Sequence, residues 1–483
     1  MQLPRSDLAN LARALSGETQ PRDASRLPTM SRRELAAAGS NGGTWTGVIG
    51  GGRVANETIS AAARIGEPGG SGGRETSVTG VSTHGGILAY DIARHAFRRA
   101  KDIISRCTEL ADSKWNVPAQ PTAVGLGQTP GTNNGTMAGA VLQTIAPFCE
   151  TPELYAAWAA GVNINTAIDY VVNNFIPSGL PLRTQVVNAL NGLKTTPAAP
   201  EPATESSAEQ RIAVELEREV TSVFFGRRDA QRALKSAIQS SRHLIYIETP
   251  GFCTTAASSP PKYAADLIGL LKTQLTSRPG LRLIVCVQKN PDFAAGYEGM
   301  TSYEVTDRLT IVRGKAGPSP VTPLPQTAVF HPIGFPGRYA RVETNIVIID
   351  DNWIMSGGAT IRRRGLTFDG SSDVVLTDTL IENGRSVAIR DYRRGLMATR
   401  LGIVADSSQP SFVALNDPAT AFKVVRDALD AGGLGDISPV WDGTAPGVTL
   451  ATPLPIEQSN PEGRDFDIAT ALLVSALAAA SGV

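Results

Sequence analysis

A regular alternation of helix and strand patterns between residues 229 and 402 places the strongest constraint on how this chain can fold. Apolar residues recur at helical spacing in 229–241, and the short apolar segment HLIYIE follows at once. A second helix pattern, 263–275, precedes the apolar segment LRLIVCV. Because these segments are continuously apolar, they predict strands that are buried on both faces. We therefore expect an α/β fold in which helices cover a mostly buried sheet.

The rest of this segment continues the pattern. LTIVR (309–313), NIVIID (345–350) and DVVLT (373–377) are predicted to be further short strands. We expect NIVIID and DVVLT to lie adjacent in one sheet. An arginine-rich helix is predicted from about 385 to 401, and Gly402 provides its C-terminal cap.

Composition divides the chain into four regions. Residues 195–210, TTPAAPEPATESSAEQ, contain no large apolar residue and are typical of a linker. The linker separates an N-terminal region of unassigned fold, 1–194, from the predicted α/β domain, 211–405. Residues 406–483 form a C-terminal extension that ends in an apolar, alanine-rich helix pattern.

The N-terminal region is rich in glycine before it becomes helical. Glycine is dense from 39 to 86, with short β-prone pieces between flexible turns. A segment of this kind can become ordered against a partner. Helical spacing then predicts an amphipathic helix from 87 to about 110, and further helices in 152–175 and 181–193.

Overall composition excludes several classes of protein. Apolar residues make up 42% and charged residues 19%, as in globular proteins. Lys+Arg and Asp+Glu both number 45, so the charge balance gives no nucleic-acid or membrane-surface signal. The four widely spaced cysteines predict buried thiols, and we expect no metal and no cofactor. No secretory signal and no transmembrane segment is recognised, which favours a cytoplasmic protein.

One segment has the form of a site for chemistry. RVETNIVIIDDNWIMSGGATIRRRG (341–365) predicts a strand, a tight turn at Asp350–Asp351, a second strand and a turn at Gly357–Gly358. Such a turn can hold polar groups rigidly at the ends of buried strands. The candidates in this segment are Glu343, Asn345, Asp350 and Thr360.

The spacing of this segment, together with the elements around it, resembles one repeat of the phospholipase D superfamily. Members of that family have a strand of the type Ile-Tyr-Ile-Glu, matched here by HLIYIE, and then His-x-Lys-x-x-x-x-Asp and Gly-Ser-x-Asn. Asp350 matches the motif aspartate, and Gly357 to Thr360 stand in place of Gly-Ser-x-Asn. Arg364-Gly365 stands at an Arg-Ser position, Ser371 to Asp373 stand at Asp-Ser-Glu, and RDYRRGLMATRLGI matches the closing helix. The resemblance covers 221–402, somewhat under half of the chain, and implies a phospholipase D-like α/β/α layer domain.

The resemblance also implies that the catalytic groups are missing. The family's histidine attacks phosphorus, while its lysine and asparagine hold the nonbridging oxygens. Here Glu343 stands at the histidine position, Asn345 at the lysine position and Thr360 at the asparagine position. A carboxylate repels phosphate, and neutral hydrogen bonds are weaker than charge-assisted ones. The degenerate positions are therefore Glu343, Asn345, Asp350, Thr360 and Asp373, and none is assigned a catalytic role.

Histidines elsewhere offer alternatives. His84 and Asp91 have the separation of a second motif, but Gly86 replaces its lysine. That match is either vestigial or accidental. Of the others, His331 is the one considered as a replacement nucleophile. We expect His95 on a helix, His243 before a strand and His331 in a Pro/Gly-rich loop.

Arginines supply the positive charge near this segment. Arg362, Arg363 and Arg364 are a candidate anion-binding cluster, and five more arginines load the predicted closing helix. The alternative is an ordinary surface on which each guanidinium has a local partner. The helix arginines are Arg385, Arg390, Arg393, Arg394 and Arg400.

Two functions from different classes fit these residues. The first is a catalytically degenerate phospholipase D-like protein with a structural, recognition or assembly role, such as a subunit of a larger complex. The second is a phosphodiesterase, either phospholipase or nuclease, that acts through unrecognised residues or a partner-supplied motif. Protein partners or further copies of the chain are expected. Pairing of two sites is not, since it would bring copies of Glu343 and Asp373 together.

Overall fold

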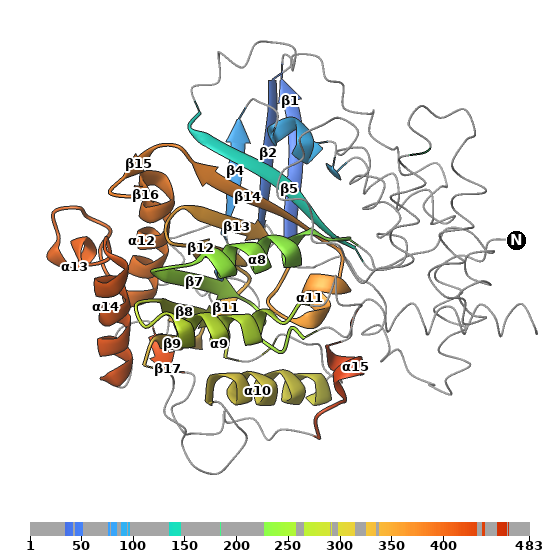
Figure 1. Cartoon of the computed structure of the whole chain (residues 1–483), viewed down its shortest axis with the longest axis vertical. Coiled ribbons are helices and arrows are strands. Elements are labelled where there is room, and N and C mark those ends of the chain that lie inside the picture. The colour runs from blue at the N-terminus through green and yellow to red at the C-terminus, as the bar shows by residue number, and fades with distance from the viewer. Residues whose placement is uncertain are drawn as a thin grey trace, which may run out of the picture.

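The computed structural model describes the elements that build the predicted α/β domain, together with parts of the N-terminal region (Figure 1). The described residues are 34–41, 44–51, 76–77, 79–84, 88–93, 95–96, 135–145, 184, 227–256, 265–289, 291, 298–313, 325–334, 338–431, 437–439, 452–460 and 462. The expected linker, the helix at 152–175, the helix at 181–193 apart from residue 184, and the terminal apolar helix lie outside them.

A mixed sheet forms the centre of the fold. Its strands run in the order β10-β9-β8-β7-β12-β13-β14-β5-β6, and β17 also pairs with β9. Strands β7, β8 and β9 are parallel to one another, and the other pairs are antiparallel. The bounds are β5 Met137–Ile145, β6 Arg227–Arg228, β7 Leu244–Thr249, β8 Arg282–Val287, β9 Thr327–Gly334, β10 Arg338–Tyr339, β12 Ile346–Ile349, β13 Trp353–Gly357, β14 Ser371–Asp378 and β17 Ile437–Pro439.

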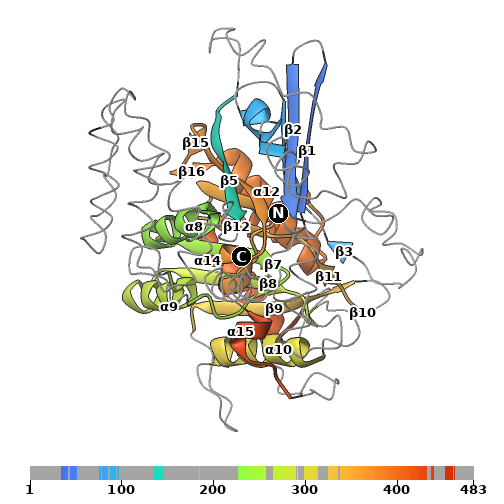
Figure 2. The ribbon, with the colours of Figure 1, turned by 90° about the vertical axis from the view of Figure 1, so that its right-hand side faces the viewer.

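Helices cover both faces of this sheet, so the structure has the expected α/β layers (Figures 1 and 2). Helices α8 (Asp229–Ser240) and α9 (Leu267–Ser277) pack on one face, and α12 (Val387–Leu401) and α14 (Pro418–Asp430) pack on the other. Helix α10 (Glu298–Arg313) lies beside the short helix α15 (Ile456–Ser459). Two further short helices are α11 (Arg363–Thr367) and α13 (Pro410–Val413).

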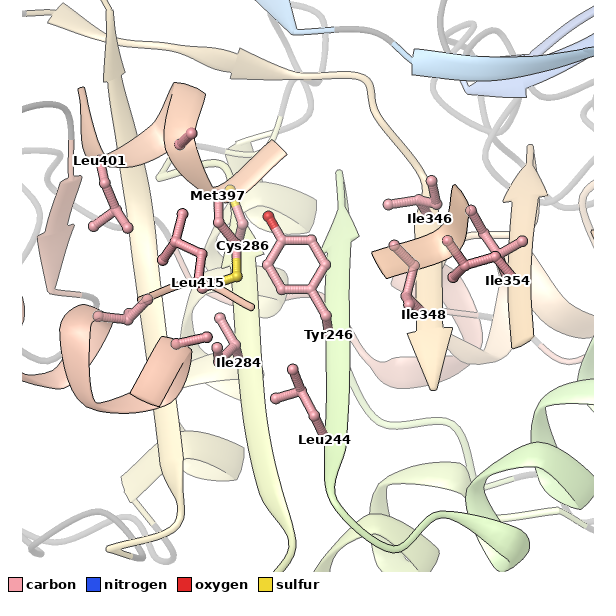
Figure 3. Packing of buried hydrophobic residues seen from close by; sticks show 14 of the residues in the cluster. Leu244, Tyr246, Ile284, Cys286, Ile346, Ile348, Ile354, Met397, Leu401 and Leu415 are labelled. Atoms are coloured by element: carbon pink, nitrogen blue, oxygen red, sulfur yellow. The ribbon is translucent and has the colours of Figure 1, made fainter. Parts of the chain in front are cut away.

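Two hydrophobic clusters hold these layers together. Successive strand residues point to opposite faces, so Tyr246 of β7 joins the α12 face while Ile247 joins the α8 face. On the α12 face, Tyr246 and Cys286 lie beside Met397 (Figure 3). Apolar burial of this extent provides the main stabilisation, at about 25 cal/mol per Å². Cys253 and Cys286 are buried free thiols, as predicted, whereas Cys107 and Cys149 lie outside the described residues.

Three expectations about strands need correction. Strands β12 and β14 share one sheet, but β13 lies between them because each pairs with β13 in an antiparallel arrangement. Residues 309–313 form the end of α10 and are not a strand. Residues 327–334, which were not predicted as a strand, form β9, so buried His331 lies on a strand and not in a loop. A five-residue apolar run such as LTIVR fits helix and strand equally well.

The N-terminal region contributes strands to three sheets. Within it, β1 (Glu34–Asn41), β2 (Thr44–Gly51) and β4 (Thr79–His84) form a three-stranded antiparallel sheet. Strand β5 pairs with β14 along the full length of β14. The residues of β5 in this pairing are Met137 to Thr144. The main sheet therefore includes residues from the N-terminal side of the expected linker. Two small pairs complete the structure: β3 (Thr76–Ser77) with β11 (Arg341–Val342), and β15 (Ile381–Glu382) with β16 (Arg385–Ser386).

Among the helices that the structure describes, none combines the length and the apolar character needed to cross a membrane.

Candidate functional site

The degenerate positions gather at one edge of the main sheet, except for Asp350. At this edge, called the site edge below, β7 and β13 end and β12 and β14 begin. The segment 357–360, called the glycine turn below, follows β13 there. Asn345, Thr360 and Asp373 lie in or beside the glycine turn, and all three are buried.

Asn345 stands at the position where the resemblance places a lysine, and its side chain is used for structure. Its Nδ2 donates to the Ala359 carbonyl at 2.9 Å, and its Oδ1 accepts from the Thr249 hydroxyl at 3.0 Å. The residue is fully buried, with 0% of its surface exposed. Asn345 therefore fastens the glycine turn to the end of β7, and its amide does not face solvent.

Asp373 fastens the same turn from the other side. Its Oδ1 accepts from the Ala359 backbone amide at 3.0 Å, and its Oδ2 accepts from the Ser371 hydroxyl at 3.0 Å. A side chain at position 357 would meet both the Asp373 carboxylate and the Ser372 carbonyl. The close packing explains why glycine occupies position 357. Asn345 and Asp373 together bind both polar groups of the Ala359 backbone.

Glu343 and Thr360 complete the degenerate set at the site edge. Glu343 is buried, and its Oε1 lies 3.7 Å from Nη1 of Arg341. The Thr360 hydroxyl accepts from Nε of Arg362 at 2.9 Å. Residues 343–345 precede β12, so Glu343 and Asn345 lie outside the strand.

Asp350 lies at the opposite edge of the sheet. It occupies the turn between β12 and β13, where its φ is 53°. Its carboxylate accepts from the backbone amides of Arg242, His243 and Leu244 at 2.7, 2.7 and 2.8 Å. Aspartate tolerates the left-handed conformation better than most residues. Asp350 is therefore a structural residue that closes the loop before β7.

The candidate anion-binding arginines have partners within the protein. Arg362 forms an ion pair with Glu304 of α10 at 3.1 Å, and Arg364 makes two contacts of 2.7 Å with Asp369. Burial lowers the pKa of Arg364, but the Asp369 carboxylate outweighs it and the net pKa is raised. Arg363 donates from Nε to the Asn460 carbonyl at 2.7 Å. The cluster is thus directed inward.

The arginines of α12 and of the segment before it also have partners. Arg400 contacts the Glu248 carboxylate from Nε at 3.2 Å and from Nη2 at 2.8 Å, and the Tyr246 hydroxyl donates to the same carboxylate at 2.5 Å. Burial, followed by the Glu248 charge, raises the pKa of Tyr246. The remaining pairs are Arg385 with Asp417, Arg390 with Glu382, Arg393 with Asp351 and Arg394 with Asp391.

A histidine that sequence reasoning left without a role lies beside Ser372, the residue before Asp373. His95, which is helical as predicted, places Nε2 2.5 Å from the Ser372 hydroxyl and Nδ1 2.7 Å from Nε2 of Gln143. An amide nitrogen donates, so Nδ1 is the acceptor and Nε2–H donates to the serine oxygen. The pairing between β5 and β14 brings Gln143 opposite Ser372. No local signal in the sequence indicates this contact.

The other three histidines belong to three different segments of the fold. His84 ends β4 and Asp91 lies in the helical residues 88–93, so one strand does not carry both residues of the possible second motif. The backbone of His243 binds Asp350 at the opposite edge. His331 donates from Nδ1 to the Val287 carbonyl at 2.9 Å, and burial, followed by the charge of Arg308, lowers its pKa to about 3.

Comparison with known proteins yields similar structures only. No family model and no curated protein sequence matches the chain. Nuc from Salmonella typhimurium, a phospholipase D family member, is 11% identical with a TM-score of 0.25, over 36% of this chain and 88% of that one.

Two further structures have similar values. NucT from Helicobacter pylori is 15% identical with a TM-score of 0.24, over 36% of this chain and 89% of that one. Phosphatidylserine synthase from Haemophilus influenzae is 11% identical with a TM-score of 0.24, over 51% of this chain and 58% of that one. Likenesses with identities and TM-scores this low carry no argument about this chain, and the roles of individual residues rest on the contacts described above.

Proposed function

We propose that this chain is a catalytically degenerate phospholipase D-like protein with a recognition or assembly role, as a subunit of a larger protein complex. The observation that carries the proposal is the state of Asn345. Its amide is fully buried and both of its polar atoms are engaged with Thr249 and Ala359. A side chain in this state holds the turn together, and its burial keeps the amide away from a phosphate that arrives from solvent.

The surrounding charges support the same proposal. Phosphoryl transfer needs a nucleophile together with cations that stabilise the charge on the phosphoryl oxygens. At the site edge, Glu343 provides a carboxylate, and Arg362 and Arg364 are paired with Glu304 and Asp369. A phosphate would have to compete with these buried carboxylates for the guanidinium groups. Such competition is unfavourable, because breaking a buried ion pair leaves one charge uncompensated.

Direct measurement of phosphodiester cleavage tests the proposal. The full chain is incubated with a chromogenic phosphodiester, with double-stranded DNA and with phosphatidylcholine vesicles. We expect no release of product above that of the buffer. Turnover that increases in proportion to protein concentration would overturn the proposal. Affinity purification with mass spectrometry should in parallel recover protein partners in fixed proportion to the chain.

One observation favours the alternative, a phosphodiesterase that uses unrecognised residues. His95 lies 2.5 Å from the Ser372 hydroxyl, within reach for proton transfer. In the tautomer described above, however, Nε2 already carries a proton and cannot accept one from serine. If cleavage is observed, the variants His95→Gln and Ser372→Ala test whether these two side chains are responsible for it. Loss of activity in both variants would establish the alternative.

The form of the assembly is a separate part of the proposal. We expect that two site edges do not face each other, because two copies of Glu343 would meet without a lysine to offset them. Light scattering of the wild type and of Glu343→Lys tests this expectation. An assembly that is unchanged by the substitution agrees with it, and a dimer lost in the variant contradicts it.

A further inference from the structure

A C-terminal segment returns to the site edge and is held there by polar contacts. Residues 452–460 include α15, and the Leu454 amide donates to the Gly299 carbonyl of α10 at 3.1 Å. Figure 2 shows α15 against α10. The first residues of the segment are exposed, whereas Asn460 and Glu462 are 2% and 0% exposed. The chain therefore buries polar residues at the end of the segment and leaves its start in solvent.

Both the side-chain amide and the backbone of Asn460 form hydrogen bonds with the main domain. Its Nδ2 donates to the Thr254 carbonyl at 2.7 Å, and its Oδ1 accepts from the Arg364 backbone amide at 2.9 Å. Its backbone carbonyl accepts from Nε of Arg363 at 2.7 Å. Only a primary amide of this length supplies both the donor and the acceptor at these positions. Aspartate lacks the donor, and glutamine is one methylene longer.

A buried guanidinium binds the carboxylate of Glu462. Its Oε1 accepts from both Nη1 and Nη2 of Arg228 at 3.3 Å, and Arg228 is 3% exposed. Arg228 belongs to β6 at the edge of the main sheet, far along the chain from Arg363 and Arg364. Two charges are buried together at this point, and removing either one leaves the other uncompensated. Arg228 therefore selects a negative charge two residues after the asparagine.

We infer that these groups form a peptide-recognition site that selects the pattern Asn-x-Glu. The receptor groups come from separate elements of the main domain: Arg228 from β6, Thr254 from the loop after β7, and Arg363 and Arg364 from α11. In this structure the site is occupied by the chain's own residues 460 and 462. Of the three arginines that the sequence suggested for anion binding, Arg363 binds this segment through its guanidinium and Arg364 through its backbone amide.

The partner that fits is a second copy of this chain. Every copy carries both the receptor groups and the segment that they bind, so the segment of one copy can bind to the receptor groups of the next. Such a head-to-tail contact is heterologous and can build rings or filaments. The occupation seen here, within one chain, closes the site until the segment is released. This inference rests on the proposed recognition role, for which it names the partner.

Peptide binding by the full chain tests the inference. In the double variant Asn460→Ala, Glu462→Ala, the chain's own segment lacks the two side chains that bind the receptor groups. A fluorescein-labelled peptide of residues 452–462, TPLPIEQSNPE, is titrated against this variant and against the wild type, and its anisotropy is measured. We expect saturable binding to the double variant, at least about tenfold tighter than to the wild type, whose own segment competes as a tethered ligand.

Matched controls locate the binding site. A peptide with the asparagine changed to aspartate should bind the double variant at least about tenfold more weakly, because it cannot donate to Thr254. Adding Arg228→Gln to the double variant should weaken binding of the original peptide by about a hundredfold. Circular dichroism shows whether each variant is folded. If the double variant does not fold, Asn460→Ala alone takes its place, with weaker but saturable binding expected.

A second measurement needs no substitution. Excess unlabelled peptide is added to the wild type at millimolar concentration, and hydrogen exchange is followed by mass spectrometry. We expect faster exchange in residues 452–460 as the peptide displaces them. The inference is overturned if a folded variant does not bind, if both peptides bind equally, or if exchange in the wild type is unchanged. Peptide binding and phosphodiester cleavage are measured separately, so a failure here leaves the result for the proposed function distinguishable.

Discussion

The Asp351 carboxylate and the Arg393 guanidinium form a fully buried ion pair, with Nε and Nη2 of the arginine 2.6 and 2.8 Å from the two carboxylate oxygens. The pair joins the turn after β12 to the middle of α12. It lies at the edge of the sheet opposite the site edge, and both side chains are 0% exposed.

Asp351→Asn should lower the free energy of unfolding by about 3 kcal/mol, because it leaves the Arg393 charge buried without compensation. Asparagine tolerates the φ of 57° at this position, so the backbone is not strained further. Urea unfolding followed by circular dichroism provides the measurement. Lys423→Ala, which removes an exposed pair with Asp427, is the control and should change stability by less than about 0.5 kcal/mol. Equal effects of the two variants would contradict the prediction.

Asn345→Ala should destabilise the protein by about 2 kcal/mol, because the Ala359 carbonyl loses its buried donor. The substitution tests whether the residue at the degenerate position is structural. Asn416→Ala is a matched control, since its side-chain oxygen makes no hydrogen bond, and a change within roughly 0.5 kcal/mol is expected. Thermal unfolding of both variants decides the question. A stable Asn345→Ala protein would show that the glycine turn does not depend on this amide.

Two glycine substitutions should have opposite effects. Gly357→Ala places a methyl group against the Asp373 carboxylate and the Ser372 carbonyl, so a loss of about 2 kcal/mol is expected. Gly395→Ala lies in α12, where the added methyl group meets nothing within 4 Å. It should raise stability by about 0.5 to 1 kcal/mol, because alanine favours a helix more than glycine does. Denaturant midpoints measured side by side check the two signs, and a loss in both variants would refute the contrast.

The stability of the fold should decrease as the pH falls below about 6.5, in part because of His331. Burial, followed by the charge of Arg308, lowers its pKa to about 3 in the folded protein. The unfolded chain therefore binds a proton between pH 6.5 and 3 that the folded chain does not, and stability is lost as pH falls through this range. His331→Gln should reduce the loss between pH 6.5 and 5 by about 2 kcal/mol. Parallel curves of unfolding free energy against pH for the two proteins would rule out this contribution.

The alternation of elements was predictable because it depends on local patterns. Apolar runs such as 244–249 and 282–287 are rich in β-branched residues and each follows a helix pattern, which favours buried strands, and both are strands in the structure. Residues 309–313 were assigned to the wrong element, because a short apolar run does not show a period. The order of strands could not be derived, since the register between β5 and β14 depends on contacts between distant parts of the chain.

The candidate site was also predictable in part. Asn345, Thr360 and Asp373 were placed near one another by motif spacing, and they surround the glycine turn in the structure. The spacing could not indicate that each side chain forms hydrogen bonds within the protein, because these bonds depend on groups that are distant in the sequence. His95 and Asn460 were missed for this reason. Each reaches the site edge from a part of the sequence with no motif of its own.

The position of β5 in the main sheet has a consequence for how the protein is made. Thr144 pairs with Ser371, although more than two hundred residues separate them. On a ribosome that adds about 5 to 20 residues per second, β5 would wait roughly 10 to 45 s for its partner strand. During that time the amides and carbonyls of β5 that bind β14 are unpaired. The pairing of β5 with β14 therefore forms late in synthesis, and nascent chains that meet in this interval can pair through β5 with each other instead.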